Sequence, residues 1–383
     1  MASSNERLGF YASVFVSSLG LGLYLYFVPV FAQSLGANFL DLGYIGTAGA
    51  LTYAVAPFFV GQLADRMSHR ILYALAILIN FASTSSLVFS MTVYDVVINR
   101  AVAGLGLAFF WPITEILVLD LTRREDRVKE MGRYSIAWGS AFLIGPFVGG
   151  IVIQIAGFFT LFVISSVLSF CSLAGVIFLI SPKQRFEGNN DSSMPKLKEQ
   201  FHVVIQLFPW FCLLICYGLI FSIVTSIFPG YANSIGVSAV LIGVLFTAFG
   251  MARVATYASS ERWFHFGERK ALGLASFLLV VGSALIILLP RFPAFLIAIP
   301  LMGGCFAIIF PLSLGLISRH FSEAQRGAAV GLYESTYGVG AAVGPILAGM
   351  LATVLDVRIS FVSGVVAGIL MMIIAAKAKT FKD

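Results

Sequence analysis

Long apolar segments, separated by short polar ones, follow one another along the whole of this chain. The segments are continuous rather than alternating, and they are longer than the ~10-residue strands of a membrane β-barrel. A helix needs about 20 mostly apolar residues to cross a bilayer, so the pattern predicts twelve membrane-spanning helices. The predicted helices cover residues 8–33, 39–64, 69–91, 95–121, 129–154, 158–180, 206–230, 238–260, 269–290, 293–317, 327–351 and 359–377.

The composition changes this picture only by excluding a soluble protein. Of the 383 residues, 59% are hydrophobic and 11% are charged, and the mean hydropathy is +0.96. Water-soluble domains carry about a quarter charged residues. The four cysteines, Cys171, Cys212, Cys216 and Cys305, all fall inside apolar segments, and their spacing predicts neither a metal site nor a disulfide framework. We therefore expect an all-α membrane protein without a cofactor.

The second half of the chain repeats the first at an offset of 199 residues. The matching pairs are Gly104 and Gly303, Pro112 and Pro311, Gly132 and Gly331, Tyr134 and Tyr333, Gly139 and Gly338, Gly145 and Gly344, Pro146 and Pro345, and Gly150 and Gly349. A long internal repeat is typical of transporters built from two related halves. We expect two six-helix halves, residues 1–180 and 206–383, joined by a polar cytoplasmic linker at 181–205.

The positions of lysine and arginine predict the orientation of the chain. If the N-terminus is cytoplasmic, 20 of the 24 lysines and arginines fall in the inner segments. Positive charge is enriched on the cytoplasmic side of membrane proteins. We therefore expect a multi-pass protein of the cell membrane with both termini in the cytoplasm. The net charge of +6 then reflects topology and not nucleic-acid binding, and we interpret the four histidines as solvated residues of inner loops and helix ends.

The loop between the second and third helices, GQLADRMSHR at residues 61–70, resembles the loop signature of the major facilitator superfamily. That signature reads G-x-x-x-D-R-x-G-R followed by Lys or Arg, and here Ser68 and His69 replace the usual Gly-Arg pair. The second half keeps only a trace, ERWFHFGERK at 261–270. The resemblance implies a gate in which Asp65 closes the cytoplasmic side by packing helix two against helix eleven. The matching residues are Gly61, Asp65, Arg66 and Arg70.

Three further stretches resemble the drug–proton antiporter branch of that superfamily. Residues 21–29 are similar to its helix-one motif, residues 100–108 to its helix-four motif R-x-x-x-G-x-G-x-A, and residues 139–150 to its helix-five motif ending in G-P-x-x-G-G. Glycines leave a helix surface without side chains, and proline bends a helix. Helices five and eleven are therefore expected to pack closely against their neighbours and to slide along them during transport. Ordinary small-residue packing is the alternative. The positions concerned are Gly139, Gly145, Pro146, Gly149, Gly150, Gly344 and Pro345.

Several ionisable residues are predicted to lie inside the bilayer, where a charge is costly and usually functional. We expect Arg253 to pair with Glu334 within the second half, so that Glu115 faces the cavity as the proton carrier. Arg100 lies on the same helix as Glu115 and can line the same cavity. Asp120 lies nearer to water, where the inner arginines would meet it. The alternative interpretation is a set of structural ion pairs.

Aromatic residues make up 14% of the chain. In the superfamily that this chain resembles, helices 1, 4, 7 and 10 wall a central cavity, so the resemblance implies an aromatic and largely apolar substrate pocket. Packing in the core is an equal alternative for each ring. The candidate pocket residues are Tyr24, Tyr26, Phe110, Trp111, Tyr134, Trp138, Tyr217, Phe310, Tyr333 and Tyr337.

These features predict a monomeric secondary transporter that works by alternating access between its two halves. The expected substrates are small hydrophobic or amphipathic organic compounds, exported against protons, with Glu115 and Glu334 as the protonation sites. Uptake or facilitated diffusion of a polar solute, such as a sugar or an organic acid, is the nearest alternative, and a non-transporting receptor is another. An enzyme is not expected, because no Ser–His, di-Asp or His–Glu constellation falls within the predicted helices.

Overall fold

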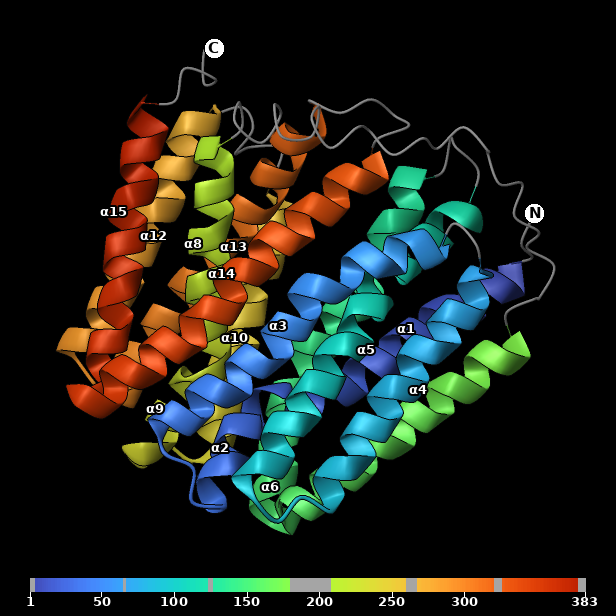
Figure 1. The fold of residues 1–383 in the computed structure, drawn as a ribbon, viewed down its shortest axis with the longest axis horizontal. Coiled ribbons are helices and arrows are strands. Elements are labelled where there is room, and N and C mark those ends of the chain that lie inside the picture. Colours follow the sequence, from blue (N-terminus) through green and yellow to red (C-terminus); the bar gives the residue numbers. More distant parts are fainter. Residues whose placement is uncertain are drawn as a thin grey trace. The chain divides into compact units, whose positions relative to one another are not determined.

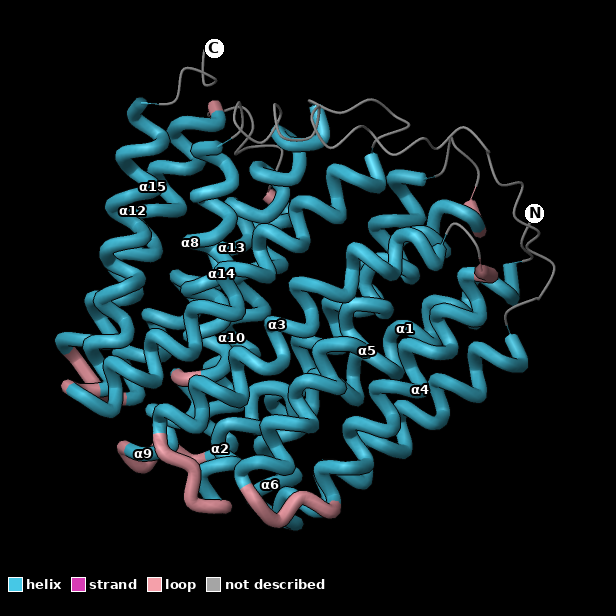
Figure 2. Tube along the Cα trace, viewed as in Figure 1, coloured by secondary structure: helices cyan, strands magenta, loops and turns pink. Residues whose placement is uncertain are grey.

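The computed structural model describes residues 4–64, 67–122, 127–179, 208–259, 267–319 and 326–377, and these residues are almost entirely helical (Figure 1). Figure 2 shows that short loops join the helices. The elements are α1 (Ser4–Tyr24), the 3-10 helix η1 (Leu25–Phe27), α2 (Val28–Ser34), α3 (Phe39–Ala64), α4 (His69–Val88), α5 (Val93–Asp120), α6 (Arg127–Leu179), α8 (Phe208–Ser226), α9 (Phe228–Ser234), α10 (Ala239–Ala258), α12 (Glu268–Leu288), α13 (Phe292–Arg319), α14 (Arg326–Val354), the 3-10 helix η4 (Val357–Phe361) and α15 (Val362–Lys377). Helical structure occupies each of the twelve predicted segments.

Ten helical stretches of the described residues are long and apolar enough to cross a membrane. One of them, Lys129–Phe178 within α6, has 50 residues, more than twice the ~20 that one crossing needs. The helix is broken at Gly157, where φ is 77° and ψ is 177°. Residues other than glycine rarely adopt that conformation. Gly157 therefore separates the fifth and sixth predicted spans, and the protein is an all-α, multi-pass membrane protein.

The start of α5 is fixed by its own sequence. The Thr92 side chain accepts a hydrogen bond from the backbone N–H of Asp95, and Asp95 Oδ2 accepts one at 2.8 Å from the backbone N–H of Thr92. This reciprocal capping satisfies donors that the first helical turn leaves unpaired. It sets the position of α5, which carries Arg100 and Glu115 about 10 and 33 Å from its first residue at 1.5 Å per residue.

The two halves are structurally equivalent. The helices α4, α5 and α6 begin 199 residues before α12, α13 and α14, and α5 and α13 both have 28 residues. Side-chain contacts repeat as well. Thr114 Oγ1 lies 2.8 Å from the Tyr134 hydroxyl, and Ser313 Oγ donates to the Tyr333 hydroxyl at 3.5 Å. The predicted pair of pseudo-symmetric halves is confirmed.

The described helices form two compact units. Unit 1 contains residues 1–37, 48–188 and 238–247, and unit 2 contains 38–47, 189–237 and 248–383. The first turns of α3 therefore belong to unit 2 and the rest of α3 to unit 1. The first turns of α10 belong to unit 1 and the rest of α10 to unit 2. The predicted boundaries at residues 180 and 206 fall outside the described residues, so the division at the linker stays a prediction.

The core of unit 1 lies between α1, α4, α5 and α6. Aliphatic and aromatic side chains from all four helices are buried there, so each helix turns one face inward and leaves apolar residues on its outer face. The largest inward residues include Phe10, Tyr73, Phe110, Leu117 and Tyr134. Exposed apolar side chains are what a helix presents to lipid.

Candidate functional site

The predicted gate motif is described only in part. Asp65 and Arg66 lie outside the described residues, and Gly61 lies near the end of α3. Arg70 lies on α4 and hydrogen-bonds to the last turns of α6. Its Nε donates to the Val176 carbonyl at 3.4 Å and its Nη2 donates to the Ile177 carbonyl. The role of this motif as a gate stays a prediction.

His69 joins three helices beside that motif. Its Nδ1 lies 2.6 Å from Asp120 Oδ2, at the end of α5, and its Nε2 lies 3.1 Å from the Ala64 carbonyl oxygen, at the end of α3. Only 4% of His69 is exposed. Interpreting this histidine as a solvated loop residue is therefore wrong. Asp120 was predicted to meet arginines. It contacts His69 instead, which stands where the loop signature has an arginine.

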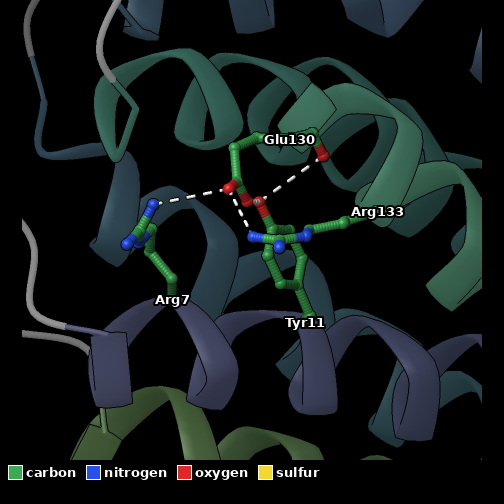
Figure 3. A network of polar contacts seen from close by, with 4 residues as sticks. All are labelled: Arg7, Tyr11, Glu130 and Arg133. Atoms are coloured by element: carbon green, nitrogen blue, oxygen red, sulfur yellow. Dashed lines mark hydrogen bonds and ion pairs between the residues drawn. The ribbon is translucent and has the colours of Figure 1, made fainter. Parts of the chain in front are cut away.

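Sequence reasoning missed a second polar cluster, shown in Figure 3. The Glu130 side chain is 3% exposed, and its Oε1 lies 2.6 Å from Arg133 Nη1 and 3.4 Å from Arg7 Nη1. The Tyr11 hydroxyl donates to Glu130 Oε2 at 2.6 Å. Two cations and a phenol thus compensate one buried carboxylate and connect the starts of α1 and α6. The spacing of Glu130 and Arg133 was the available signal, because residues three apart share a helix face.

The glycines of the helix-five motif pack α6 against α1 within unit 1. A Cβ on Gly145 would lie 2.6 Å from the carbonyl carbon of Gly22, and one on Gly149 would overlap the Leu23 carbonyl oxygen. Such distances leave no room for a side chain. Gly139 differs, because a Cβ there would meet nothing within 4 Å. Close packing therefore involves the later glycines of the motif.

A second face of the same helix meets the start of α10, also in unit 1. A Cβ on Gly150 would lie 2.5 Å from the Ala239 carbonyl oxygen, and Gly243 packs on the backbone of Pro146. Thr247 Oγ1 donates to the Leu143 carbonyl at 3.0 Å. Because α10 comes from the second half of the sequence, this face connects the two sequence halves.

Unit 2 repeats both contacts. A Cβ on Gly344 would lie 2.5 Å from Ser222 Oγ on α8, within the second half. On the other face, one on Gly43 of α3 would lie 2.7 Å from the Pro345 carbonyl oxygen, and Thr47 Oγ1 donates to the Ala342 carbonyl at 2.7 Å. The small-residue helices α6 and α14 therefore have equivalent two-sided packing.

An aromatic cluster occupies α5 and α6 in unit 1. The Trp111 ring lies 5.5 Å from Trp138 and 5.2 Å from Phe110, in edge-to-face geometry. Glu115 is half-buried one turn after Trp111 and lies close enough to Tyr134 to interact with it electrostatically. The structure thus brings four predicted pocket residues, Phe110, Trp111, Tyr134 and Trp138, to the vicinity of one predicted proton site.

The remaining two candidates of unit 1 lie elsewhere. Tyr26 stacks on Phe246 of α10 with a centroid distance of 3.9 Å, and Tyr24 is fully buried against Phe162 and Thr84. Both are therefore packed inside unit 1, and Tyr26 takes part in the contact between η1 and α10.

Arg253 lies among aromatic rings in unit 2. Its guanidinium carbon is 5.7 Å from the centroids of Phe221 and Phe249 and 5.9 Å from that of Tyr257, and its Nη2 donates to the Tyr257 hydroxyl at 3.2 Å. Cation–π attraction of this kind stabilises a guanidinium away from water. The predicted pairing of Arg253 with Glu334, which is half-buried on α14, stays a prediction.

Tyrosines from α8 and α14 extend this aromatic cluster. Tyr217 lies 5.2 Å from Tyr337 and 5.3 Å from Phe306, and Phe310 lies 5.9 Å from Tyr333. The four candidate pocket residues of the second half therefore lie in two aromatic groups of unit 2. Their contact with a substrate stays a prediction.

The repeated helices and the two-sided glycine packing are typical of transporters built from two related halves. The family model of the Major Facilitator Superfamily matches residues 10–265 and 210–380. The chain belongs to that superfamily, whose members transport small molecules and are not enzymes. The expected resemblance is therefore confirmed at the level of the family.

Curated relatives include drug resistance proteins. The chain is 24% identical over 360 residues to multidrug resistance protein 1 of Bacillus subtilis, covering 91% of this chain and 90% of that protein. It is 23% identical over 373 residues to quinolone resistance protein NorA of Staphylococcus aureus, covering 95% of each. A solved point mutant of the nucleoside transporter NupG has the same fold, with a TM-score of 0.83 at 12% identity over 97% of this chain and 99% of that one.

Proposed function

We propose that this chain exports small hydrophobic or amphipathic organic compounds in exchange for protons. The observation that carries the proposal is the grouping of aromatic rings around ionisable side chains on membrane-spanning helices. Trp111 and Tyr134 accompany Glu115 in unit 1, and Phe221 and Phe249 accompany Arg253 in unit 2. Aromatic side chains can bind apolar compounds of different shapes, and a charged side chain beside them can bind the polar end of an amphipathic compound. The names of the two relatives, a multidrug resistance protein and a quinolone resistance protein, support the same substrate class.

Protons act in this proposal through Glu115 and Glu334. A carboxylate on a membrane-spanning helix is costly when charged and inexpensive when neutral, so a proton changes which conformation is favoured. The two halves alternate in exposing the substrate site. In the same proposal Asp65 holds the cytoplasmic gate, both termini lie in the cytoplasm, and the transporter works as a monomer.

A proteoliposome flux assay tests this function. The panel contains ethidium, rhodamine 6G, 2-naphthoate, uridine and D-xylose, each measured with and without an imposed pH gradient. We expect flux of the aromatic compounds that depends on the gradient and is unchanged in the control Cys171→Ser, since Cys171 is an exposed thiol. Flux of uridine or xylose alone would favour the polar-solute alternative, and the absence of any flux would favour a receptor.

A further inference from the structure

His69 makes two contacts that the proposed transport cycle does not use. It is the first residue of α4, it is buried, and each of its ring nitrogens faces an oxygen atom of another helix. We infer that His69 and Asp120 form a proton-dependent link, which senses pH and holds the end of α3 beside the predicted gate motif. The inference concerns regulation and does not depend on which compound is transported.

The two contacts of His69 together require one additional proton. Its Nδ1 lies 2.6 Å from a carboxylate oxygen of Asp120, and its Nε2 lies 3.1 Å from the carbonyl oxygen of Ala64. Both oxygens are acceptors, and a neutral imidazole carries a hydrogen on only one of its two nitrogens. A neutral His69 beside a charged Asp120 would therefore place two lone pairs against each other in one of the contacts. With one more proton on the pair, both contacts become hydrogen bonds.

The helix ends around His69 favour that proton. Ala64 is the last residue of α3 and Asp120 is the last residue of α5, so both contacts are made at C-terminal helix ends. The last carbonyl groups of a helix lack intrahelical partners and carry partial negative charge. The start of α4 acts in the opposite direction, because a helix N-terminus disfavours a cation. Two C-terminal ends and one carboxylate outweigh one N-terminus.

Protons can reach this buried pair through Asp120. The His69 side chain is 4% exposed, whereas 35% of the Asp120 side chain is exposed. The charged side chain that faces His69 from α5 is Asp120, and the charged residues at 65–66 and 123–126 lie outside the described residues. Histidine ordinarily changes charge between about pH 5 and 8. In the proposed orientation this end of unit 1 faces the cytoplasm, so the link would respond to cytoplasmic pH.

Arg70, the next residue of α4, makes a contact that does not depend on pH. Its guanidinium donates to the carbonyl oxygens of Val176 and Ile177 at the end of α6. A guanidinium keeps its charge at every physiological pH. The start of α4 therefore stays joined to α6, while its link to α3 and α5 through His69 depends on a proton.

The contact of Arg70 is repeated in the second half. At the offset of 199 residues, Arg269 corresponds to Arg70 and Ala376 corresponds to Ile177. Arg269 Nη2 donates to the Ala376 carbonyl at 2.8 Å, near the end of α15. Both units thus use this arginine to join the start of one helix to the end of another.

The proton-dependent link is not repeated with the same chemistry. Glu268 and Arg319 occupy the positions equivalent to His69 and Asp120. Each half therefore has residue types of opposite charge at the two positions, with the signs exchanged. Glutamate and arginine side chains ordinarily keep their charges between about pH 6 and 9. The fold does not require a histidine there, and the pH-sensitive version is specific to unit 1.

A purely structural role explains the choice of histidine less well. The loop signature has an arginine at this position, and an arginine could donate to both oxygens at every pH. Histidine makes the same connection conditional on a proton. The stabilisation is present while the pair holds its proton at low pH and is lost as the pH rises. Loss of either contact frees the end of α3, which leads directly into the predicted gate residue Asp65.

Melting temperatures of the purified full chain test the link without any substrate. Wild type, His69→Arg and His69→Gln are compared between about pH 5 and 9. Over this range wild type should lose about 2–4 °C more than His69→Arg, the effect of one charge-assisted hydrogen bond. His69→Gln is neutral throughout, so it should be less stable than wild type at low pH and approach it at high pH. The variants share every other ionisable group, so differences between the curves isolate His69.

Flux in proteoliposomes tests whether the link regulates transport. The best-transported aromatic compound moves down its own gradient with the same pH on both sides, so no proton gradient drives it. As the pH rises, wild-type flux should increase relative to that of His69→Arg, because release of the end of α3 eases movement of the gate. Arg70→Lys is the matched control, since it keeps a permanent charge beside His69 and should keep the wild-type pH dependence.

Two results would overturn the inference: parallel melting curves of wild type and His69→Arg, or a constant ratio of their flux rates at all pH values. If His69→Arg fails to fold, Asp120→Asn decides in its place. Its amide can donate to a neutral imidazole, so both ring nitrogens are satisfied without the additional proton, and a wild-type pH response in that variant would contradict the link. If no compound is transported, the proposed function fails, and the melting curves still decide whether the link depends on a proton.

Discussion

The residues where α1, α4 and α5 meet in unit 1 have equivalents in unit 2. The helices correspond, but the side chains at these positions are polar in unit 1 and apolar in unit 2. Unit 1 has a tyrosine, an asparagine and an arginine where unit 2 has aliphatic residues. The apolar version shows what the scaffold alone needs. The polar version carries buried atoms that have no hydrogen-bond partner among the residues described, and such atoms reduce stability. The residues compared are Tyr24, Asn80 and Arg100 in unit 1, and Val224, Leu279 and Ile299 in unit 2.

Substitutions at the glycines that pack alike in both halves are expected to have the largest effect on transport and stability. Gly145→Leu and Gly344→Leu should both abolish transport and lower the melting temperature, because each places a side chain where a neighbour already lies 2.5–2.6 Å from the Cβ position. Overpacking typically costs about 1–3 kcal/mol. Gly139→Leu is the matched control, since its Cβ position is open. Thermal unfolding and flux in proteoliposomes measure the effect, and wild-type behaviour of either glycine variant would refute equivalent packing.

A smaller effect, an increase in stability, is expected from a substitution at a position where the two halves differ. Asn80→Leu copies Leu279 and removes two buried polar atoms that have no partner in the described structure. An unsatisfied buried group costs about 1–3 kcal/mol, so the melting temperature should rise. The reverse change in unit 2, Leu279→Asn, should lower it. A fall in stability of Asn80→Leu would show that the asparagine is structural.

The smallest effect compares the repeated tyrosines. The Thr114–Tyr134 distance is 2.8 Å and the Ser313–Tyr333 distance is 3.5 Å, and hydrogen bonds weaken as they lengthen. Tyr134→Phe should cost about 1 kcal/mol and Tyr333→Phe less. Denaturation of both variants under one condition measures the difference. If Tyr333→Phe lost more stability than Tyr134→Phe, the hydrogen bond of Tyr134 would not be the stronger of the two.

Most of the architecture followed from the sequence because hydrophobic length alone distinguishes a membrane span from a loop. The repeat was also readable, since glycines and prolines such as Pro146 and Pro345 keep their register. The break between the fifth and sixth spans was predicted within residues 155–157, but its exact position at Gly157 was not, because the sequence does not show that the φ of this glycine is positive. Likewise, the glycine pattern could not separate Gly139, which is open, from Gly149, which is packed.

The polar contacts were harder to predict, because they join residues far apart in the chain. Glu130 was not among the predicted site residues, because its contacts are with Arg7 and Tyr11, more than 100 residues earlier. His69 looked like a loop histidine until the end of α5 placed Asp120 against it. In both cases the residue type was visible and the partner was not, since a single sequence does not specify which helix faces meet.

Proton movement driven by a transported compound tests the central claim most directly. Liposomes containing the protein and a trapped pH dye are given a gradient of the best-transported aromatic compound, with no imposed pH difference. Wild type should change the internal pH as the compound moves, and Glu115→Gln should abolish this change while still binding the compound. Wild-type flux without any pH change, or a pH change in Glu115→Gln equal to that of wild type, would contradict proton-coupled export through Glu115.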